Sequence, residues 1–346
     1  MALDVNVKID ISKPVGKVGF GFPLLLSVNQ TTGATPKDYT ICSSLDDVVT
    51  AGFEKTTSIY KTAALLFQQN DAPKKIAVAE CVKTGSDTDT GYAAAVQTEL
   101  AEPDWRQLII MDNTDALKVA DVIETTDNRM FFCAVDFDEE KLPKTKYERT
   151  VICNFVSNRI GATSTEGGAC AEAAIVGASA GLDVGSFTYK NLIIKGVEPS
   201  ELTDSELAEF NSKNVITVAS KAGDIVTTEG KVVGGEYIDI VDSKDYVVQS
   251  LEYKTQKALN TYKKIPYDNN GIAVLESIAI DVMQDSFNKG IIAANSDGTG
   301  AYEVSYALVE DVSADDKATR KYIGGKFKFT LAGAIHEVEI TGEISI

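Results

Sequence analysis

The stretch Ser58-Ile-Tyr-Lys-Thr-Ala-Ala-Leu-Leu-Phe-Gln-Gln69, followed after Pro73 by Lys75-Ile-Ala-Val-Ala-Glu-Cys81, predicts the fold of the first half of the chain. Apolar residues recur at helical spacing in the first segment, and the second is a short apolar run typical of a buried strand. Outward from this pair, from Phe22 to about Ala180, short apolar runs continue to alternate with amphipathic stretches. This alternation is typical of βαβ units, so we expect an α/β first domain with a largely parallel or mixed sheet.

The individual elements of this domain can be placed by their periodicity and by capping residues. We expect strands at residues 22–28, 75–81, 107–111, 130–135 and 151–155. We expect helices at residues 45–53, 58–69, 92–100 and 116–125. Ser44 and Asp115 are the expected N-caps of two of these helices, because their side chains can accept hydrogen bonds from unpaired amides of the first turn.

The second half of the chain has a different pattern. Thr203-Asp-Ser-Glu206 predicts a capping box that opens a short helix, and residues 215–240 predict several short strands separated by glycines. Two longer helices are expected around residues 247–262 and 272–287, and Pro266 between them favours a reversal of the chain. We therefore expect an α+β second domain in which a helical hairpin packs on a sheet.

Both ends of the chain alternate apolar and polar residues, which predicts a strand with one apolar face at each end. The apolar positions that carry this prediction are Val5, Val7, Ile9 and Ile11 at the start and Val338, Ile340, Ile344 and Ile346 at the end. The expected organisation is an N-terminal arm (1–18), the α/β domain (19–182), the α+β domain (183–332) and a C-terminal arm strand (333–346).

A terminal strand needs a host sheet, because its apolar face and its row of amides and carbonyls have no partners of their own. Two interpretations are open. Each strand is an edge strand of its own domain, as is common for chain ends, or it is donated to the sheet of a neighbouring copy.

Composition narrows the range of partners. The chain has 346 residues, 44% of them apolar, and a formal net charge of −18, which disfavours binding to nucleic acid or to anionic membrane surfaces. We expect no membrane insertion, since no window of about 20 residues is apolar enough to span a bilayer. The five cysteines are widely spaced and the start lacks a signal-peptide pattern, so we expect folding in a reducing cytoplasm.

The one enzymatic pattern is Gly177-Ala-Ser179-Ala-Gly181, which fits G-x-S-x-G and is followed in the chain by acidic residues and by the single histidine, His336. A nucleophile elbow needs a strand before the serine and a helix after it. Here the residues before Ser179 favour a helix and those after it do not, so close packing of small residues is the favoured interpretation, and an α/β-hydrolase-like serine esterase is the alternative.

No other pattern predicts catalytic, cofactor-binding or metal-binding residues. Acidic clusters occur at residues 87–89, 136–140 and 295–297, but none has the spacing of a calcium-binding loop. We expect these clusters to be solvated loops, Trp105 to be a packing residue, and the protein to be neither an enzyme nor dependent on a cofactor.

Several segments, in order and spacing, resemble the sheath subunits of contractile phage tails and of tail-like R-type bacteriocins, over nearly the whole chain. The resemblance starts with Val18-Gly-Phe-Gly-Phe-Pro-Leu-Leu-Leu and continues with Tyr60-Lys-Thr-Ala-Ala-Leu-Leu-Phe67. Its most distinctive part is Gly235-Glu-Tyr-Ile-Asp239, Lys264-Ile-Pro-Tyr267 and Gly290-Ile-Ile-Ala293. Tyr246 departs from the pattern, because many relatives have tryptophan there.

The resemblance implies a structural protein that polymerises helically, as stacked hexameric rings, around a tail tube, and that contracts to drive the tube through a cell envelope. It implies that the terminal strands add to sheets of neighbouring subunits, and that the further partners are the tube, baseplate and tail terminator proteins. It also implies assembly in a bacterial cytoplasm and release as part of a phage tail or tail-like particle. A non-contractile tube or capsid protein is the other alternative.

Overall fold

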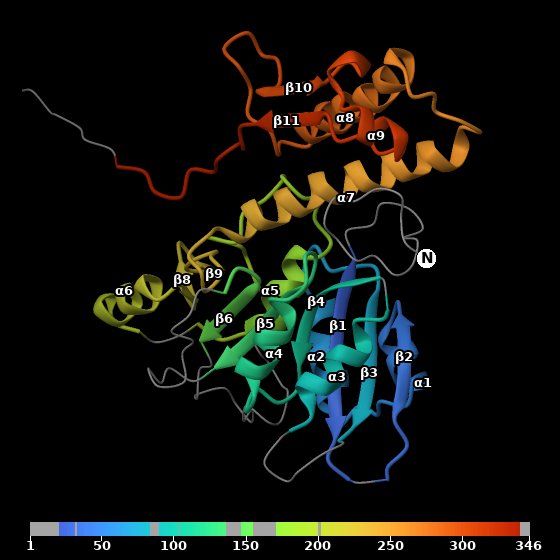
Figure 1. Ribbon diagram of the computed structural model, residues 1–346. Helices are drawn as coiled ribbons and strands as arrows, with labels where there is room; N and C mark the ends of the chain where they lie inside the picture. Colours follow the sequence, from blue (N-terminus) through green and yellow to red (C-terminus); the bar gives the residue numbers. More distant parts are fainter. Residues whose placement is uncertain are drawn as a thin grey trace, which may run out of the picture. The chain divides into compact units, whose positions relative to one another are not determined.

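Figure 1 shows the computed structural model of the chain, which describes residues 21–31, 33–83, 90–102, 104–135, 147–154, 171–199 and 202–339. The chain divides into two compact units, with the boundary between Lys263 and Lys264.

The first unit is built on a sheet of seven strands in the described residues. In spatial order these are β2 (Lys37–Cys42), β3 (Ile76–Val82), β1 (Phe22–Asn29), β4 (Trp105–Ile110), β5 (Met130–Val135), β6 (Thr150–Asn154) and β7 (Val215–Ile216). All neighbouring pairs are parallel except β2 and β3, which are antiparallel. The α/β prediction for this part of the chain is confirmed.

Helices cover both faces of this sheet, and each face has its own apolar core. Leu25 of β1 packs in one core, with residues of α1 (Leu45–Thr50), α2 (Ser58–Phe67) and α5 (Ala171–Ser179). Leu24 and Leu26, its neighbours in the strand, point into the other core, with residues of α3 (Tyr92–Glu99), α4 (Ala116–Ile123) and α6 (Asp204–Ser212). Because all three leucines are fully buried, β1 is a continuous apolar run rather than an alternating one.

Two of the predicted caps are confirmed, and for the third the position is right but the expected side-chain bond is absent. The Asp47 N–H donates to Ser44 Oγ (3.2 Å), and the capping box of Thr203 and Glu206 is present. Asp115 occupies the N-cap position of α4, but its carboxylate accepts from the Thr90 N–H (2.9 Å) instead of from its own helix.

Strand β2 was not among the strands predicted from the sequence. Lys37, Asp38 and Thr40 make this edge strand polar, so it lacks the apolar pattern of the other strands.

The first unit extends further along the chain than the expected boundary at residues 182 and 183. After α6 and β7 come the hairpin of β8 (Val218–Lys221) and β9 (Asp224–Thr227), then the long helix α7 (Ile238–Thr261). These residues stay with the first unit because β7 pairs with β6 and because Tyr189, Val232 and Ile238 fill the same core as Leu25.

The second unit is small. It contains α8 (Asn269–Asn288), β10 (Tyr302–Tyr306), a 3₁₀ turn (Val309–Asp311), α9 (Ala314–Ala318) and β11 (Gly325–Phe329). Strands β10 and β11 are antiparallel. The two long helices that we expected as a hairpin therefore belong to different units, with α7 closing the first and α8 opening the second.

The small residues of the G-x-S-x-G segment allow α5 to pack closely on α2. A Cβ atom on Gly177 would lie 2.6 Å from the Leu66 carbonyl oxygen, and one on Gly181 would overlap the Asp71 carbonyl oxygen. Both neighbours are backbone atoms, which cannot rotate away as a side chain would.

We predict that Gly177→Ala lowers the free energy of unfolding by about 1–3 kcal/mol, the usual cost of overpacking a core. Gly333→Ala is the matched control, because a Cβ atom there meets nothing within 4 Å, and we expect it to change stability by less than about 0.5 kcal/mol. Urea unfolding followed by circular dichroism measures both. Equal stability of the two variants would contradict the close packing of α5 on α2.

Candidate functional site

The described part of the C-terminal arm leaves the small sheet without forming a strand. Pairing after β11 continues to Ala332, whose N–H donates to the Ile291 carbonyl (2.9 Å), and Leu331 bridges to Ile292. Residues 333–339 belong to no strand, and Ile335 and Val338 are 84% and 74% exposed. In Figure 1 this segment runs away from β10 and β11. Ile335 and Val338 therefore present apolar surface to the solvent.

The other predicted interface residues cannot be placed in the same way. Val5, Val7, Ile9 and Ile11 in the N-terminal arm and Ile340, Ile344 and Ile346 in the C-terminal arm all lie outside the described residues.

The sheet of the second unit has two chemically distinct faces. On one face Val304 is opposite Phe327 and Tyr302 is opposite Phe329. The Tyr302 hydroxyl donates to Gln284 Oε1 of α8 (3.1 Å), so this apolar face is directed toward α8. On the other face Glu303 is opposite Lys328. Phe327 and, on α8, Ile280 each remain 43% exposed, so the apolar face is only partly covered.

In the first unit, a buried ionic cluster ties α7 to the sheet. Arg106 of β4 is 1% exposed and forms an ion pair with Asp242 of α7. Its Nη1 donates to Asp245 Oδ2 (2.9 Å) and to the Asn128 carbonyl (2.9 Å). The Tyr189 hydroxyl donates to Asp242 Oδ2 (3.0 Å).

Arg149 completes this cluster with two parallel hydrogen bonds to Asp245, of 2.8 and 3.0 Å. Burial opposes ionisation of Asp245, but Arg106 and Arg149 outweigh it and hold the pKa of this carboxyl below its ordinary value. The first turns of α7 are therefore fixed to β4 and to the start of β6 by charge-assisted bonds in a dry environment.

We predict that Asp242→Ala lowers the free energy of unfolding of the first unit by about 3–5 kcal/mol, because it leaves the Arg106 charge buried with one partner fewer. Lys213→Ala is the control, since it removes a solvent-exposed ion pair with Glu209 on α6 and should cost less than about 0.5 kcal/mol. Both are measured by urea unfolding. A loss below about 1 kcal/mol for Asp242→Ala would mean that the cluster does not hold α7.

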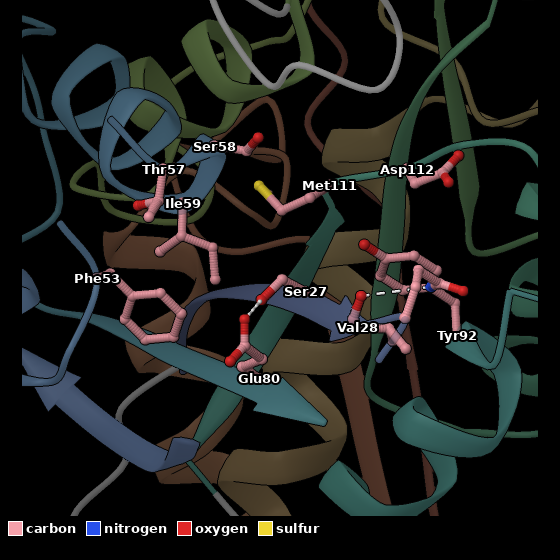
Figure 2. Close-up of a pocket in the computed structure, with 11 residues that line it drawn as sticks. Ser27, Val28, Phe53, Thr57, Ser58, Ile59, Glu80, Tyr92, Met111 and Asp112 are labelled. Atoms are coloured by element: carbon pink, nitrogen blue, oxygen red, sulfur yellow. Dashed lines mark hydrogen bonds between the residues drawn. The ribbon is translucent and has the colours of Figure 1, made fainter. Parts of the chain in front are cut away.

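A pocket of about 270 Å³ lies at the carboxyl ends of β1, β3 and β4. The strand order reverses here, which is where open α/β sheets commonly bind ligands. Figure 2 shows the side chains that line this space, with the carboxylate of Glu80 beside the hydroxyl of Ser27. The lining residues are Ser27, Val28, Gln30, Phe53, Thr57, Ser58, Ile59, Glu80, Tyr92, Met111 and Asp112.

Both carboxylates of the pocket already have partners. Glu80 forms an ion pair with Lys37 and accepts a bond from Ser27 Oγ (3.5 Å), while Asp112 Oδ1 accepts from the N–H (2.9 Å) and the hydroxyl (2.6 Å) of Thr114. The lining has hydroxyl groups but no histidine or cysteine to form a nucleophile–base pair. Its geometry therefore indicates no particular reaction.

The structure also argues against a nucleophile elbow at Ser179. This serine is the last residue of α5, is 3% exposed, and its Oγ donates to the Val176 carbonyl (3.3 Å). An elbow would place the serine on a sharp turn between a strand and a helix, with its hydroxyl free to attack. The packing interpretation of this segment is therefore the one that the geometry supports.

The sequence also drew attention to Trp105 and to three acidic clusters, and the structure describes Trp105 and one of the clusters. Trp105 is fully buried, and its Nε1 donates to the Glu99 carbonyl (2.8 Å), as expected for a packing residue. Asp297 accepts from the N–H (3.0 Å) and hydroxyl (2.6 Å) of Thr299 in a turn. The acidic clusters at 87–89 and 136–140 lie outside the described residues. Among the residues that the structure describes, no three His, Cys, Asp or Glu side chains converge as a metal site.

Within the same described residues, none of the helices has the length and apolar character needed to cross a bilayer.

Comparison with known proteins identifies the fold. No family model matches the sequence, and no curated protein matches it. Solved structures do match: a chain of the contracted sheath complex of the extracellular contractile injection system PVC has a TM-score of 0.72 at 11% identity. A chain of the baseplate of the anti-feeding prophage (AFP) scores 0.71, and one of the contracted AFP helical sheath scores 0.67, both at 15% identity.

Each of these three matches covers 99% of this chain and 98% of the other chain. The chain thus has the fold of the sheath proteins of contractile injection systems over its full length, as the sequence resemblance predicted. At 11–15% identity these matches show the fold alone.

Proposed function

We propose that this protein is a structural subunit of a contractile sheath, which polymerises helically around a tail tube and contracts to drive the tube through a target envelope. The observation that carries the proposal is the match over 99% of the chain to chains from a contracted sheath complex and a contracted helical sheath. A hydrolase or a non-contractile tube protein has no comparable support, and Ser179 lacks the geometry that the hydrolase alternative requires.

The second unit supports the idea that subunits are linked by strands. A two-stranded sheet is marginally stable by itself and gains from further strands. The apolar face that holds Phe327 is partly open, and the segment that follows β11 exposes Ile335 and Val338. Strands from neighbouring copies would extend the sheet over α8 and cover Phe327 and Ile280, so we propose that the two terminal arms are exchanged between subunits.

The proposed partners follow from this arrangement. The main partner is a second copy of the chain, in stacked rings that we propose to be hexameric, and the ends of the polymer would meet baseplate and terminator proteins. The tube would fill the centre of the rings. The subunit would assemble in a bacterial cytoplasm and leave the cell as part of a phage tail or a tail-like particle.

We predict that deleting residues 1–13 or 334–346 leaves a folded subunit that does not polymerise, because each deletion removes a strand that we propose is donated and none of the helices and strands named above. The chain is co-expressed with its tube protein, and tubes are counted by negative-stain electron microscopy. Circular dichroism and thermal unfolding report on the fold. Long contractile tubes from either truncated chain would show that the arms are not the linkage.

A pair of single substitutions tests the same linkage with less disturbance. Val338→Asp places a charge on the apolar face of the expected strand, whereas Glu337→Gln changes its polar face and serves as the control. We expect Val338→Asp to reduce the number of tubes at least tenfold and Glu337→Gln to leave it within twofold. Equal tube counts would contradict an apolar role for Val338.

Contraction itself is tested by the dimensions of the assembled particles. We expect electron micrographs of the complete particle to show two populations, one long and narrow and one short and wide, with the naked tube protruding from the second. A single length and diameter under every condition, including treatment with mild denaturant, would favour a non-contractile tube.

A further inference from the structure

The C-terminal half of α7 contains a buried carboxyl group, that of Glu252, which takes part in none of the interactions described above. Glu252 is 3% exposed, and its Oε2 has no hydrogen-bond partner. One helical turn later, Oε1 of Gln256 is also buried without a partner, since the amide group of that side chain donates to Asn260 (2.9 Å). Two unpaired acceptors one turn apart are a costly arrangement in a protein interior.

Within the described residues, the positions one turn away from Glu252 on α7 offer it no cation. The residues three and four positions away on the same helix are Val248, Gln249, Thr255 and Gln256, and none of them carries a charge. The charged residue of the facing turn that acts on Glu252 is Asp127, an exposed carboxylate between α4 and β5.

Three cations of the first unit, Arg149, Arg129 and Lys257, each have another partner. Arg149 is bound to Asp245, two turns earlier on α7. Arg129 lies over the Trp105 ring, 4.3 Å from its centroid, and donates to the Glu102 carbonyl (2.8 Å). Lys257 lies over the Tyr253 ring, at 5.8 Å. An ionised Glu252 would therefore be a buried negative charge that faces a second negative charge.

Protonation of Glu252 would both supply a donor for an unpaired acceptor and remove the electrostatic repulsion by Asp127. A neutral carboxyl group carries an O–H donor, and residues at positions i and i+4 of a helix are neighbours, so protonated Glu252 can donate a hydrogen bond to Oε1 of Gln256. The same proton abolishes the repulsion with Asp127. The charged form can do neither.

We propose that Glu252 is a proton-dependent switch in α7: the neutral form bonds to Gln256 and holds the last two turns of the helix, and the ionised form releases them. These turns lead directly to the boundary between the two units at Lys263 and Lys264. The first turns of α7 stay fixed through Asp242 and Asp245, so the effect is confined to the end of the helix. The inference does not depend on the proposed function.

The pH range follows from the local environment. Burial, with a smaller contribution from Asp127, raises the pKa of Glu252 to about 7. Because the pKa in the folded state is above that of an unfolded glutamate, the neutral form stabilises the fold fully below about pH 4.5. This contribution is lost as the pH rises to about 7. The helix end should thus be firmly held in acid and looser at pH 8.

The test is peptide-resolved amide hydrogen exchange of the full chain between pH 5 and pH 8, corrected for the intrinsic pH dependence of exchange. For residues 252–261 we expect protection to fall at least about tenfold over this range, since each unit of pKa shift corresponds to a factor of ten. Residues 238–245 of the same helix should change less than twofold.

Variants separate the switch from a merely structural role. Glu252→Gln keeps a side-chain donor but cannot ionise, so we expect the protection of residues 252–261 to lose its pH dependence. Glu303→Gln, an exposed glutamate on β10, is the control and should behave like wild type. If Glu252→Gln keeps the wild-type pH profile, the proposal is wrong.

Two further variants keep the test decisive if Glu252→Gln folds poorly. Gln256→Ala removes the acceptor and should move the midpoint of the transition to lower pH by at least half a unit. Asp127→Asn removes the repelling charge and should also lower the midpoint. A midpoint that neither substitution moves would overturn the assignment of both partners and with it the switch.

Discussion

The buried charge of Arg106 is the constraint on which the arrangement of the first unit depends. Arg106 is the second residue of the central strand β4 and cannot lose its proton there, so carboxylates must be brought to it. The chain supplies Asp242 and Asp245 from α7, far away in sequence, and Tyr189 and Arg149 satisfy what remains of their hydrogen-bonding capacity. Residues after the α/β core are thereby bound back to it, and the first unit ends only where α7 ends.

Much of the fold could be predicted from the sequence, because periodicity and capping are local properties. The buried run around Leu25, the amphipathic helix at 58–67 and the capping box at Thr203 each carry their signal within a few residues. Strand β2 could not be found in this way, because an edge strand with Lys37 and Asp38 lacks the apolar pattern. The unit boundary also escaped prediction, since it depends on contacts between β6, β7 and α7 that no local pattern reveals.

The residues of the candidate site could be predicted from the sequence only in part. Alternation at the chain ends drew attention to Val338, which is 74% exposed. That its host sheet belongs to a neighbouring copy is our proposal, because a local pattern cannot show which molecule supplies the partner. The ionic cluster and the Glu252–Gln256 pair were missed altogether. Acidic residues on a helix look like a solvated face in a chain with 51 acidic residues, and only the three-dimensional structure shows which of them are buried.

The alternation of lysine and phenylalanine along β11 would restrict the register in which another strand can pair with it. Because side chains alternate between the two faces of a strand, an incoming strand that slips by one residue would place its isoleucines and valines among Lys326 and Lys328 instead of beside Phe327 and Phe329. Misaligned additions would bury no apolar surface and would dissociate quickly. If a neighbouring strand pairs with β11 as we propose, its own side chains would therefore favour registers that differ by two residues over registers that differ by one.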